Sequence, residues 1–291
     1  MEAPAGSRIR GIFRKGVSAL KDAGIENPAL DAAVLLGHVT WVPASGILMN
    51  PDATMTTTEI QLYDSLIRER CGHITVSRLV GNREFYSRDF YLNDDVLDPR
   101  PETEILVQEA MRRLEELSGS LSVLDIGTGS GCIAVTVAAE DPRVQVTATD
   151  ISMAALTVAR RNSIRHGVAD RVYFVRADLI GGLRKMGGFH LVLSNPPYIS
   201  LDQYKHLHED VRNGDPIGAL ISGPEGTEFY RPLVEGSRGL LRARGTLMVE
   251  VGDGQGPFVA DLFERAGYVD VQIVDDLAGK GRVVKGNRKS A

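Results

Sequence analysis

Residues 122–131 read SVLDIGTGSG, an apolar run that ends in an acid and passes at once into a glycine-rich turn. The run SVLDI has the apolar, β-branched composition of a buried strand. Glycines at 127, 129 and 131 allow a tight turn and a close approach to a ligand, because they lack a Cβ. The stretch GCIAVTVAAE at 131–140 is typical of a buried helix. A strand, a glycine turn and a helix in succession predict one unit of a parallel α/β sheet.

The same alternation extends in both directions along the chain. Helices are expected at 105–117, 152–167, 227–241 and 256–267, and strands at 145–150, 172–178, 189–195, 245–252, 269–276 and 281–286. The last two strands are separated by only a short turn, which favours antiparallel pairing. The sequence therefore predicts a Rossmann-like α/β fold whose seven-stranded sheet is mostly parallel with an antiparallel final strand.

The first part of the chain has a different pattern. Residues 1–80 have the apolar spacing of helices, and we expect the single tryptophan, Trp41, to pack among them. A β-hairpin and a proline-bracketed connector, DPRPETE, are expected at 81–104. Residues 105–291 then form the sheet domain, so we predict a small helical domain, a connector and an α/β domain.

Composition limits the classes of function. The chain of 291 residues has 33 Lys and Arg against 38 Asp and Glu, a net charge of −5, so it carries no overall basic field for nucleic acid. No apolar run is long enough to span a membrane, and the first twenty residues lack the apolar core of a signal peptide. Cys71 and Cys132 offer neither a disulfide framework nor a zinc spacing. We expect a cytoplasmic monomer without membrane contact or direct nucleic acid binding.

The glycine turn is not that of a dinucleotide-binding protein. The spacing G-x-G-x-x-G from Gly127 requires glycine at 132, where Cys132 stands. The spacing instead resembles the first motif of S-adenosylmethionine-dependent methyltransferases, which have no pyrophosphate to bind. The loop is expected to pass under the amino-acid half of S-adenosylmethionine with the residues Gly127, Thr128, Gly129, Ser130 and Gly131.

Acids end the next two strands. Asp150 can accept two hydrogen bonds from a ribose diol, and Asp178 can accept one from the adenine amino group, with Leu179 beside it. Each acid alone is explained equally well as a cap of the helix that follows. Because all three junctions fit one ligand, we predict a nucleoside-type cofactor.

The stretch SNPPY at 194–198 follows the fourth strand of this sheet. A substrate amide is a poor nucleophile because its lone pair is delocalised. The side-chain oxygen of Asn195 and the carbonyl of Pro196 can accept both N–H groups of such a substrate. Pro196 and Pro197 stiffen the turn, and Tyr198 offers a flat face for stacking. We predict that these four residues bind the substrate and carry the catalysis.

With these motifs assembled, the sequence resembles the release-factor glutamine methyltransferases, the HemK/PrmC group. GNREFY, PRPETE, LDIGTGSG, NPPY, DVRNGDPIGAL, EVGDGQ and DLAGKGRVVKG occur in that family's order between about residue 70 and residue 286. The resemblance implies a methyltransferase fold and transfer of a methyl group to the glutamine of the Gly-Gly-Gln motif of peptide-chain release factors, an event of translation termination. It also implies that the helical domain contacts the release factor and that PRPETE lines the outer side of the cofactor. The residues implied to hold the cofactor are Gly127 to Gly131, Asp150 and Asn195.

Four positions depart from the family pattern, which leaves room for glutamine methylation in another protein. Thr75 stands where proline is frequent, Asp98 where an apolar residue is usual, Leu179 where an aromatic residue often stacks on adenine, and Asp215 where glutamate precedes Pro216. Two further alternatives are a DNA adenine amino-methyltransferase, since adenine poses the same chemical problem, and a non-catalytic sensor of the cofactor. A DNA enzyme usually adds a basic recognition domain, and a sensor needs no amide clamp.

A metal site is not expected. His206 and His208 lie in a polar loop, and no third ligand is near them in the sequence.

Overall fold

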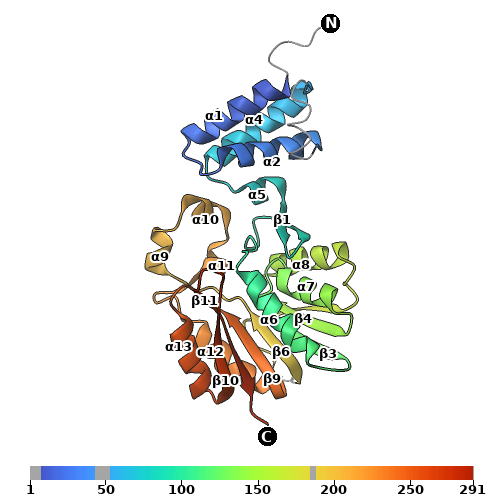
Figure 1. Cartoon of the computed structure of the whole chain (residues 1–291), viewed down its shortest axis with the longest axis vertical. Coiled ribbons are helices and arrows are strands. Elements are labelled where there is room, and N and C mark those ends of the chain that lie inside the picture. Colours follow the sequence, from blue (N-terminus) through green and yellow to red (C-terminus); the bar gives the residue numbers. More distant parts are fainter. Residues whose placement is uncertain (1–7, 43–52, 184–187, 291) are drawn as a thin grey trace. The chain divides into compact units, whose positions relative to one another are not determined.

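The computed structural model describes residues 8–42, 53–183 and 188–290 (Figure 1). The chain forms two compact units. The helical unit comprises Met1–Asn82 together with His208–Gly214, and the sheet unit comprises Arg83–Leu207 and Asp215–Ala291. The short segment His208–Gly214 thus belongs to the same compact unit as the first 82 residues, although the sequence pattern placed it in the sheet domain.

Among the residues that the structure describes, the helical unit has four helices near the start of the chain and one from the returning segment. They are α1 (Ile9–Asp22), α2 (Pro28–Thr40), α4 (Thr57–Cys71), α5 (Val76–Val80) and α10 (Glu209–Gly214). Helix α4 begins with a capping box, in which the Thr56 hydroxyl accepts from the Glu59 N–H and the Glu59 carboxylate accepts from the Thr56 N–H. The core includes the fully buried Leu20, Leu35 and Tyr63.

The prediction that Trp41 packs among these helices was wrong. Its side chain is 89% exposed. Trp41 ends α2 in the left-handed conformation, with φ of 58°, which turns the chain out of the helix.

Within the described residues, seven strands form the main sheet in the order β10-β11-β9-β6-β3-β4-β5. Their bounds are β3 (Leu121–Ile126), β4 (Val144–Asp150), β5 (Val172–Arg176), β6 (Phe189–Ser194), β9 (Leu241–Glu250), β10 (Tyr268–Asp275) and β11 (Gly281–Arg288). Only β11, the last strand of the chain, runs against its neighbours β9 and β10. The predicted fold class, a mostly parallel seven-stranded sheet with an antiparallel final strand, is confirmed.

Helices cover both faces of this sheet (Figure 1). Helices α6 (Thr103–Glu115), α7 (Cys132–Glu140) and α8 (Met153–Arg165) lie on one face, and α12 (Tyr230–Leu240) and α13 (Gly256–Arg265) lie on the other. Apolar residues alternate along the strands between two cores. Val123 and Leu191 face α6 and α7, whereas Leu124 and Val192 face α12 and α13.

The predicted hairpin consists of β1 (Asn82–Phe85) and β2 (Arg88–Tyr91). The buried amide of Asn162 on α8 anchors it, because Asn162 accepts from the Tyr91 N–H at 2.8 Å and donates to the Tyr91 carbonyl at 3.0 Å. The same amide donates to the Ser130 carbonyl at 2.8 Å. One buried side chain therefore holds the hairpin and the glycine turn together.

The long loop after β6 contains short elements of its own. Strands β7 (Ile199–Ser200) and β8 (Ile221–Gly223) pair in parallel, and α9 (Leu201–Lys205) and α11 (Ile217–Leu220) lie between them in the chain. Across 8–42, 53–183 and 188–290, no helix has both the length and the apolar composition needed to cross a membrane.

Candidate active site

The site forms where five parallel strands end. Strands β5, β4, β3, β6 and β9 are neighbours and run in the same direction, so their carboxyl ends share one edge of the sheet. In open α/β sheets this edge is where ligands bind. The predicted residues of four junctions lie at this edge, namely the glycine loop, Asp150, Asp178 and Asn195. Glu250, at the end of β9, lies there as well and was not predicted.

The glycine loop adopts the conformation that its sequence favours. Gly127, Gly129 and Gly131 have φ of +75°, +54° and +82°, which L side chains rarely adopt. A Cβ at position 127 or 129 would meet no atom within 4 Å, whereas one at position 131 would lie 2.9 Å from the Ala159 Cβ. The first two glycines thus leave open space beside the loop, and the third lets α7 approach α8.

Asp125 supports this loop from below. Its side chain is fully buried, and the Thr128 hydroxyl donates to it at 2.6 Å. Burial raises the pKa of Asp125 to about 7, although the hydrogen bonds from Thr128 and the Ala134 backbone lower it. No role for this acid was expected from the sequence.

Asp150 ties two loops together at the end of β4. Its carboxylate accepts from the Gly129 N–H and the Ser152 N–H, each at 2.9 Å. Asp150 is not the cap of α8, because the N-cap is Ser152, whose hydroxyl accepts from the Ala155 N–H at 3.1 Å. A carboxylate has about four acceptor positions, so these two bonds leave capacity for a ligand diol. The alternative interpretation of Asp150 as a helix cap is therefore wrong.

Asp178 and Leu179 follow β5. Asp178 is exposed and its carbonyl accepts from the Gly181 N–H at 2.7 Å. Leu179 has φ of 47° and its partly buried side chain packs against the core under α12. Both residues lie at the same edge as Asp150, and the Ala177 N–H donates to the Asp150 carbonyl at 3.0 Å.

The NPPY turn is fixed at its first residue. The Ser194 hydroxyl donates to the Ile126 carbonyl at 2.8 Å, which joins the ends of β6 and β3. The Asn195 Nδ2 donates to the Thr103 Oγ1 at 3.1 Å. Because the amide nitrogen is committed to Thr103, the Asn195 Oδ1 is oriented away from it as an acceptor. Pro196 is buried and Pro197 is partly buried.

Both the backbone and the ring of Tyr198 are held in place by neighbouring residues. Its carbonyl accepts from the Gln255 Nε2 at 3.1 Å, and a Cβ at position 252 would lie 3.0 Å from its ring. The Tyr198 hydroxyl donates to the Glu250 Oε1 at 3.5 Å. Burial raises the pKa of the Tyr198 phenol, and the charge of Glu250 adds to the effect.

Glu250 lies at the end of β9 with only 2% of its surface exposed. Burial raises its pKa to about 7, against a lowering by a side-chain hydrogen bond from Thr103. Its Oε2 atom is buried without a hydrogen-bond partner. A buried acid whose pKa is strongly shifted is common in active sites, and Glu250 lies beside the NPPY turn.

Two of the departures from the family pattern interact with each other. The Asp215 Oδ1 accepts from the Asp98 N–H at 3.0 Å, and the other Asp215 oxygen pairs with Arg100. The Asp98 carboxylate pairs with Arg83 at 3.5 Å. The connector that carries Thr103 is therefore fixed to the loop after NPPY by two aspartates that both stand at positions departing from the family pattern.

The helical unit has its own polar cluster. Asp210 accepts from Arg70 through both oxygens, at 3.0 and 2.8 Å, and Arg70 also pairs with Asp31 at 2.7 Å. His73, His208 and Asp210 place ligand-type atoms within 4.8 Å of one another. Sequence reasoning missed His73 and Asp210 as neighbours of His208. Because both carboxylate oxygens of Asp210 accept hydrogen bonds from Arg70, we interpret the cluster as an ion-pair network.

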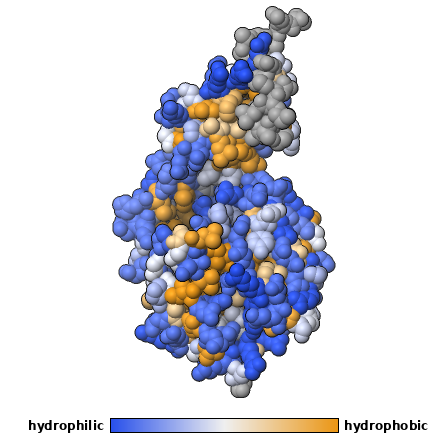
Figure 2. Space-filling model, in the orientation of Figure 1, coloured by the Kyte–Doolittle hydropathy of each residue, from blue (hydrophilic) through white to orange (hydrophobic). Residues whose placement is uncertain are grey.

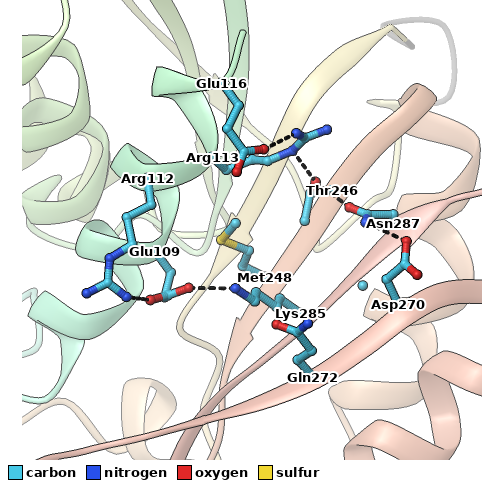
Figure 3. Close-up of a pocket in the computed structure, with 11 residues that line it drawn as sticks. Glu109, Arg112, Arg113, Glu116, Thr246, Met248, Asp270, Gln272, Lys285 and Asn287 are labelled. Carbon is cyan, nitrogen blue, oxygen red and sulfur yellow. Dashed lines mark hydrogen bonds and ion pairs between the residues drawn. The ribbon is translucent and has the colours of Figure 1, made fainter.

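A separate polar pocket of about 350 Å³ lies between α6 and the sheet strands β9, β10 and β11 (Figure 3). Figure 3 shows its charged groups paired with one another. Glu109 pairs with Arg112 and Lys285, and Arg113 pairs with Glu116. None of the residues lining it is among the candidate site residues at the carboxyl edge, so we do not place the cofactor there.

Known proteins match both units of the chain. Residues 12–81 match the model of the PrmC N-terminal domain, and residues 98–211 match the methyltransferase small domain. The release factor glutamine methyltransferase of Nitratidesulfovibrio vulgaris is 36% identical over 96% of this chain and 95% of its own length. The chain belongs to this family.

A second member of the family, from Rhodopirellula baltica, is 39% identical over 90% of each chain. The bifunctional methyltransferase of Rickettsia felis is 33% identical over 95% of this chain, which spans 57% of that longer protein. Among solved structures, the hMettl16 catalytic domain superposes with a TM-score of 0.55 at 14% identity, covering 79% of this chain and 82% of its own. A methyltransferase from Pyrococcus furiosus gives 0.50 at 20% identity, covering 70% and 91%. These two structures confirm the fold.

S-Adenosylmethionine is the cofactor of this family of methyltransferases, and the residues at the carboxyl edge fit it. The open space beside Gly127 and Gly129 provides room for the amino-acid half, and Asp150 retains acceptor capacity for the ribose. We propose that Gly127 to Gly131, Asp150, Asp178, Leu179 and Asn195 hold the cofactor, as the sequence predicted.

Proposed function

We propose that this chain transfers a methyl group from S-adenosylmethionine to the side-chain amide nitrogen of the glutamine in the Gly-Gly-Gln motif of peptide-chain release factors. The observation that carries the proposal is the orientation of the Asn195 amide at the carboxyl edge of the sheet. The chain's membership of the release factor glutamine methyltransferase family supports it. The net charge of −5 does not favour the DNA alternative.

The chemistry requires a nitrogen lone pair that is aimed and localised. Bound S-adenosylmethionine would supply an electrophilic methyl group on a sulfonium that leaves as a neutral thioether. The amide nitrogen gains the methyl group and then releases one of its two protons to solvent, so the product is a neutral N-methyl amide. The Asn195 Oδ1 and the Pro196 carbonyl accept hydrogen bonds from the two N–H groups of the substrate amide, so the substrate nitrogen faces the methyl group. These bonds strengthen as positive charge develops on the nitrogen, which makes Asn195 and Pro196 catalytic through preorganised electrostatics.

The rest of the turn limits how the substrate approaches. Pro197 prevents the turn from rearranging, because its φ is fixed. Tyr198 is anchored through Gln255 and Glu250, so the part of its ring that remains accessible is presented at a fixed position. We propose that this surface stacks on the planar substrate amide.

We propose that the helical unit recognises the release factor. It matches the PrmC N-terminal domain over residues 12–81. Apolar surface is visible on this unit in Figure 2, and the exposed large apolar side chains among its described residues are Leu30, Val34, Trp41, Val42 and Leu62. Exposed apolar side chains with polar surroundings are typical of protein-binding surfaces.

The test is transfer of labelled methyl from S-adenosylmethionine to an intact release factor. A release factor with Gln→Asn in the Gly-Gly-Gln motif is the matched substrate control. The proposal predicts label on the first protein and none on the second. Equal labelling of both, or labelling of duplex DNA instead, would refute it.

A further inference from the structure

We propose that Gln255 is a positioning residue that holds the NPPY turn and joins the two ends of the loop 199–226. This inference rests on the proposed function, because it concerns how the substrate-binding turn is kept in its orientation. Gln255 ends the stretch EVGDGQ, whose role the sequence leaves open. It is the N-cap residue of α13, where its own N–H donates to the Gly252 carbonyl at 3.0 Å.

The side-chain amide of Gln255 uses all four of its hydrogen-bonding positions. Its Nε2 donates to the carbonyls of Tyr198 and Gly226, each at 3.1 Å. Its Oε1 accepts from the Tyr230 hydroxyl at 2.7 Å and from the Gly252 N–H at 3.0 Å. Backbone carbonyls only accept and a backbone N–H only donates, so these partners allow one orientation of the amide. A flipped amide would place oxygen against oxygen and N–H against N–H.

The two carbonyls that accept from Gln255 lie at opposite ends of the loop. Tyr198 precedes the loop directly, and Gly226 is its last residue. The two backbones are in contact here, because a Cβ on Gly226 would lie 2.9 Å from the Tyr198 oxygen and from the Ser200 nitrogen. Gly226 also has φ of +81°, which L side chains rarely adopt. The Gln255 amide therefore bridges the loop at the point where its ends meet.

The NPPY turn is thereby anchored at both ends. The first anchor is the Asn195 amide, whose Nδ2 donates to the Thr103 Oγ1 at 3.1 Å. The second anchor is the Tyr198 carbonyl, which accepts from Gln255. The two prolines between these anchors have a fixed φ. With both ends held, the Pro196 carbonyl keeps one direction as an acceptor for the substrate amide.

The partners of the Gln255 oxygen belong to the buried core. Tyr230 is fully buried at the start of α12, and its hydroxyl also accepts from the Gly252 N–H at 3.3 Å. A Cβ on Gly252 would lie 2.7 Å from the Gln255 Oε1 and 3.0 Å from the Tyr198 ring. The amide and the ring thus fill the space beside this glycine. Gln255 therefore connects the loop to the core of the sheet unit.

Two substitutions remove this connection in different ways. Gln255→Glu keeps the size and one acceptor oxygen, but its second oxygen would face the carbonyls of Tyr198 and Gly226 without a proton to donate. Gln255→Met keeps a similar length and removes all four hydrogen bonds without adding charge. Gln145→Glu is the matched control, because Gln145 is exposed near the start of β4, away from the carboxyl edge that Asp150 marks.

The first experiment is hydrogen–deuterium exchange of the intact protein, followed by mass spectrometry of peptides from 199–207 and 215–226. We expect the protected amides of both segments to exchange roughly 10- to 100-fold faster in Gln255→Glu and Gln255→Met, because two hydrogen bonds between the loop ends are lost. Strands β3 and β4 should exchange as in the wild type, and Gln145→Glu should match the wild type throughout. Unchanged exchange in the two segments, or equal acceleration across the sheet, would overturn the proposal.

The second experiment is single-turnover methylation of an intact release factor at saturating cofactor and release factor. We expect both Gln255 variants to lower the rate roughly 10- to 100-fold while S-adenosylmethionine affinity in calorimetry stays within about threefold, because a displaced Pro196 carbonyl no longer aims the substrate nitrogen. A purely structural role would leave the rate per folded molecule unchanged, and that result would overturn the positioning role. If the wild type does not methylate the release factor but exchange rises in the variants, the proposed substrate fails and the anchoring by Gln255 stands.

Discussion

Substitution of Gly131 by alanine tests whether the glycine turn is shaped by the packing of α7 on α8. Gly131 has φ of +82°, where a non-glycine residue costs about 1–2 kcal/mol. Its Cβ would lie 2.9 Å from the Ala159 Cβ and 3.1 Å from the Ala159 Cα, and overpacking of this kind costs about 1–3 kcal/mol. The two effects predict that Gly131→Ala lowers the free energy of unfolding by roughly 2–5 kcal/mol.

Gly129→Ala is the matched control, because it has φ of +54° with no atom within 4 Å of the added Cβ. It should lose only the backbone contribution of about 1–2 kcal/mol. Ala159→Gly in the Gly131→Ala background removes the closest contact and should recover part of the loss. The assay is urea unfolding followed by far-ultraviolet circular dichroism, since the only tryptophan, Trp41, lies in the helical unit. Equal destabilisation by Gly131→Ala and Gly129→Ala would refute the packing argument.

Four further predictions follow from the described contacts. Asp150→Ala should weaken S-adenosylmethionine binding about 10- to 100-fold in calorimetry, since hydrogen bonds to a charged group contribute roughly 1.5–3 kcal/mol; unchanged affinity would remove Asp150 from the cofactor site. Asn195→Ala should lower kcat by roughly 10²–10³ in single-turnover methylation, with Asn195→Asp retaining more activity because it keeps an acceptor oxygen; near-normal rates for alanine would exclude the amide clamp. The pKa of Asp125 is ordinarily 3.8 and is raised to about 7 in the fold, so the folded state binds a proton more tightly than the unfolded state does. The contribution of Asp125 to the free energy of unfolding therefore falls as the pH rises from 3.8 to 7 and is constant above 7. Asp125→Asn should therefore gain stability relative to the wild type between pH 5 and pH 8 in urea unfolding, and a constant difference would contradict the shift. Arg70→Ala should destabilise the helical unit by about 3 kcal/mol, because Asp31 and Asp210 lose their common partner; it should slow methylation of an intact release factor more than that of a Gly-Gly-Gln peptide, whereas the exposed Arg68→Ala on the same helix should do neither.

The periodic features of the chain were predictable from the sequence. Apolar runs bounded by glycine and acid residues located the strands, and the parallel order then brought Gly127, Asp150 and Asn195 to one edge. The short turn before β11 predicted its antiparallel pairing. These features depend on local composition and on general rules of sheet topology, so one sequence was enough to predict them.

The features that were missed depend on single long-range contacts. The segment 208–214 packs with the helical unit, where Arg70 bonds Asp210 across 140 positions of sequence. Glu250 is the last residue of an ordinary buried strand, and its contact with Tyr198 arises only when the end of β9 meets the turn after β6. Trp41 is exposed although its large apolar side chain favours burial. No periodicity encodes such contacts.

The most direct test of the central claim is peptide mass spectrometry of a release factor incubated with this protein and S-adenosylmethionine. The account predicts a single added methyl group on the side-chain nitrogen of the Gly-Gly-Gln glutamine, and a rate that falls roughly 10²–10³-fold in Asn195→Ala. A methyl group on another residue, or none on the release factor while another protein or DNA is methylated in the same mixture, would contradict it.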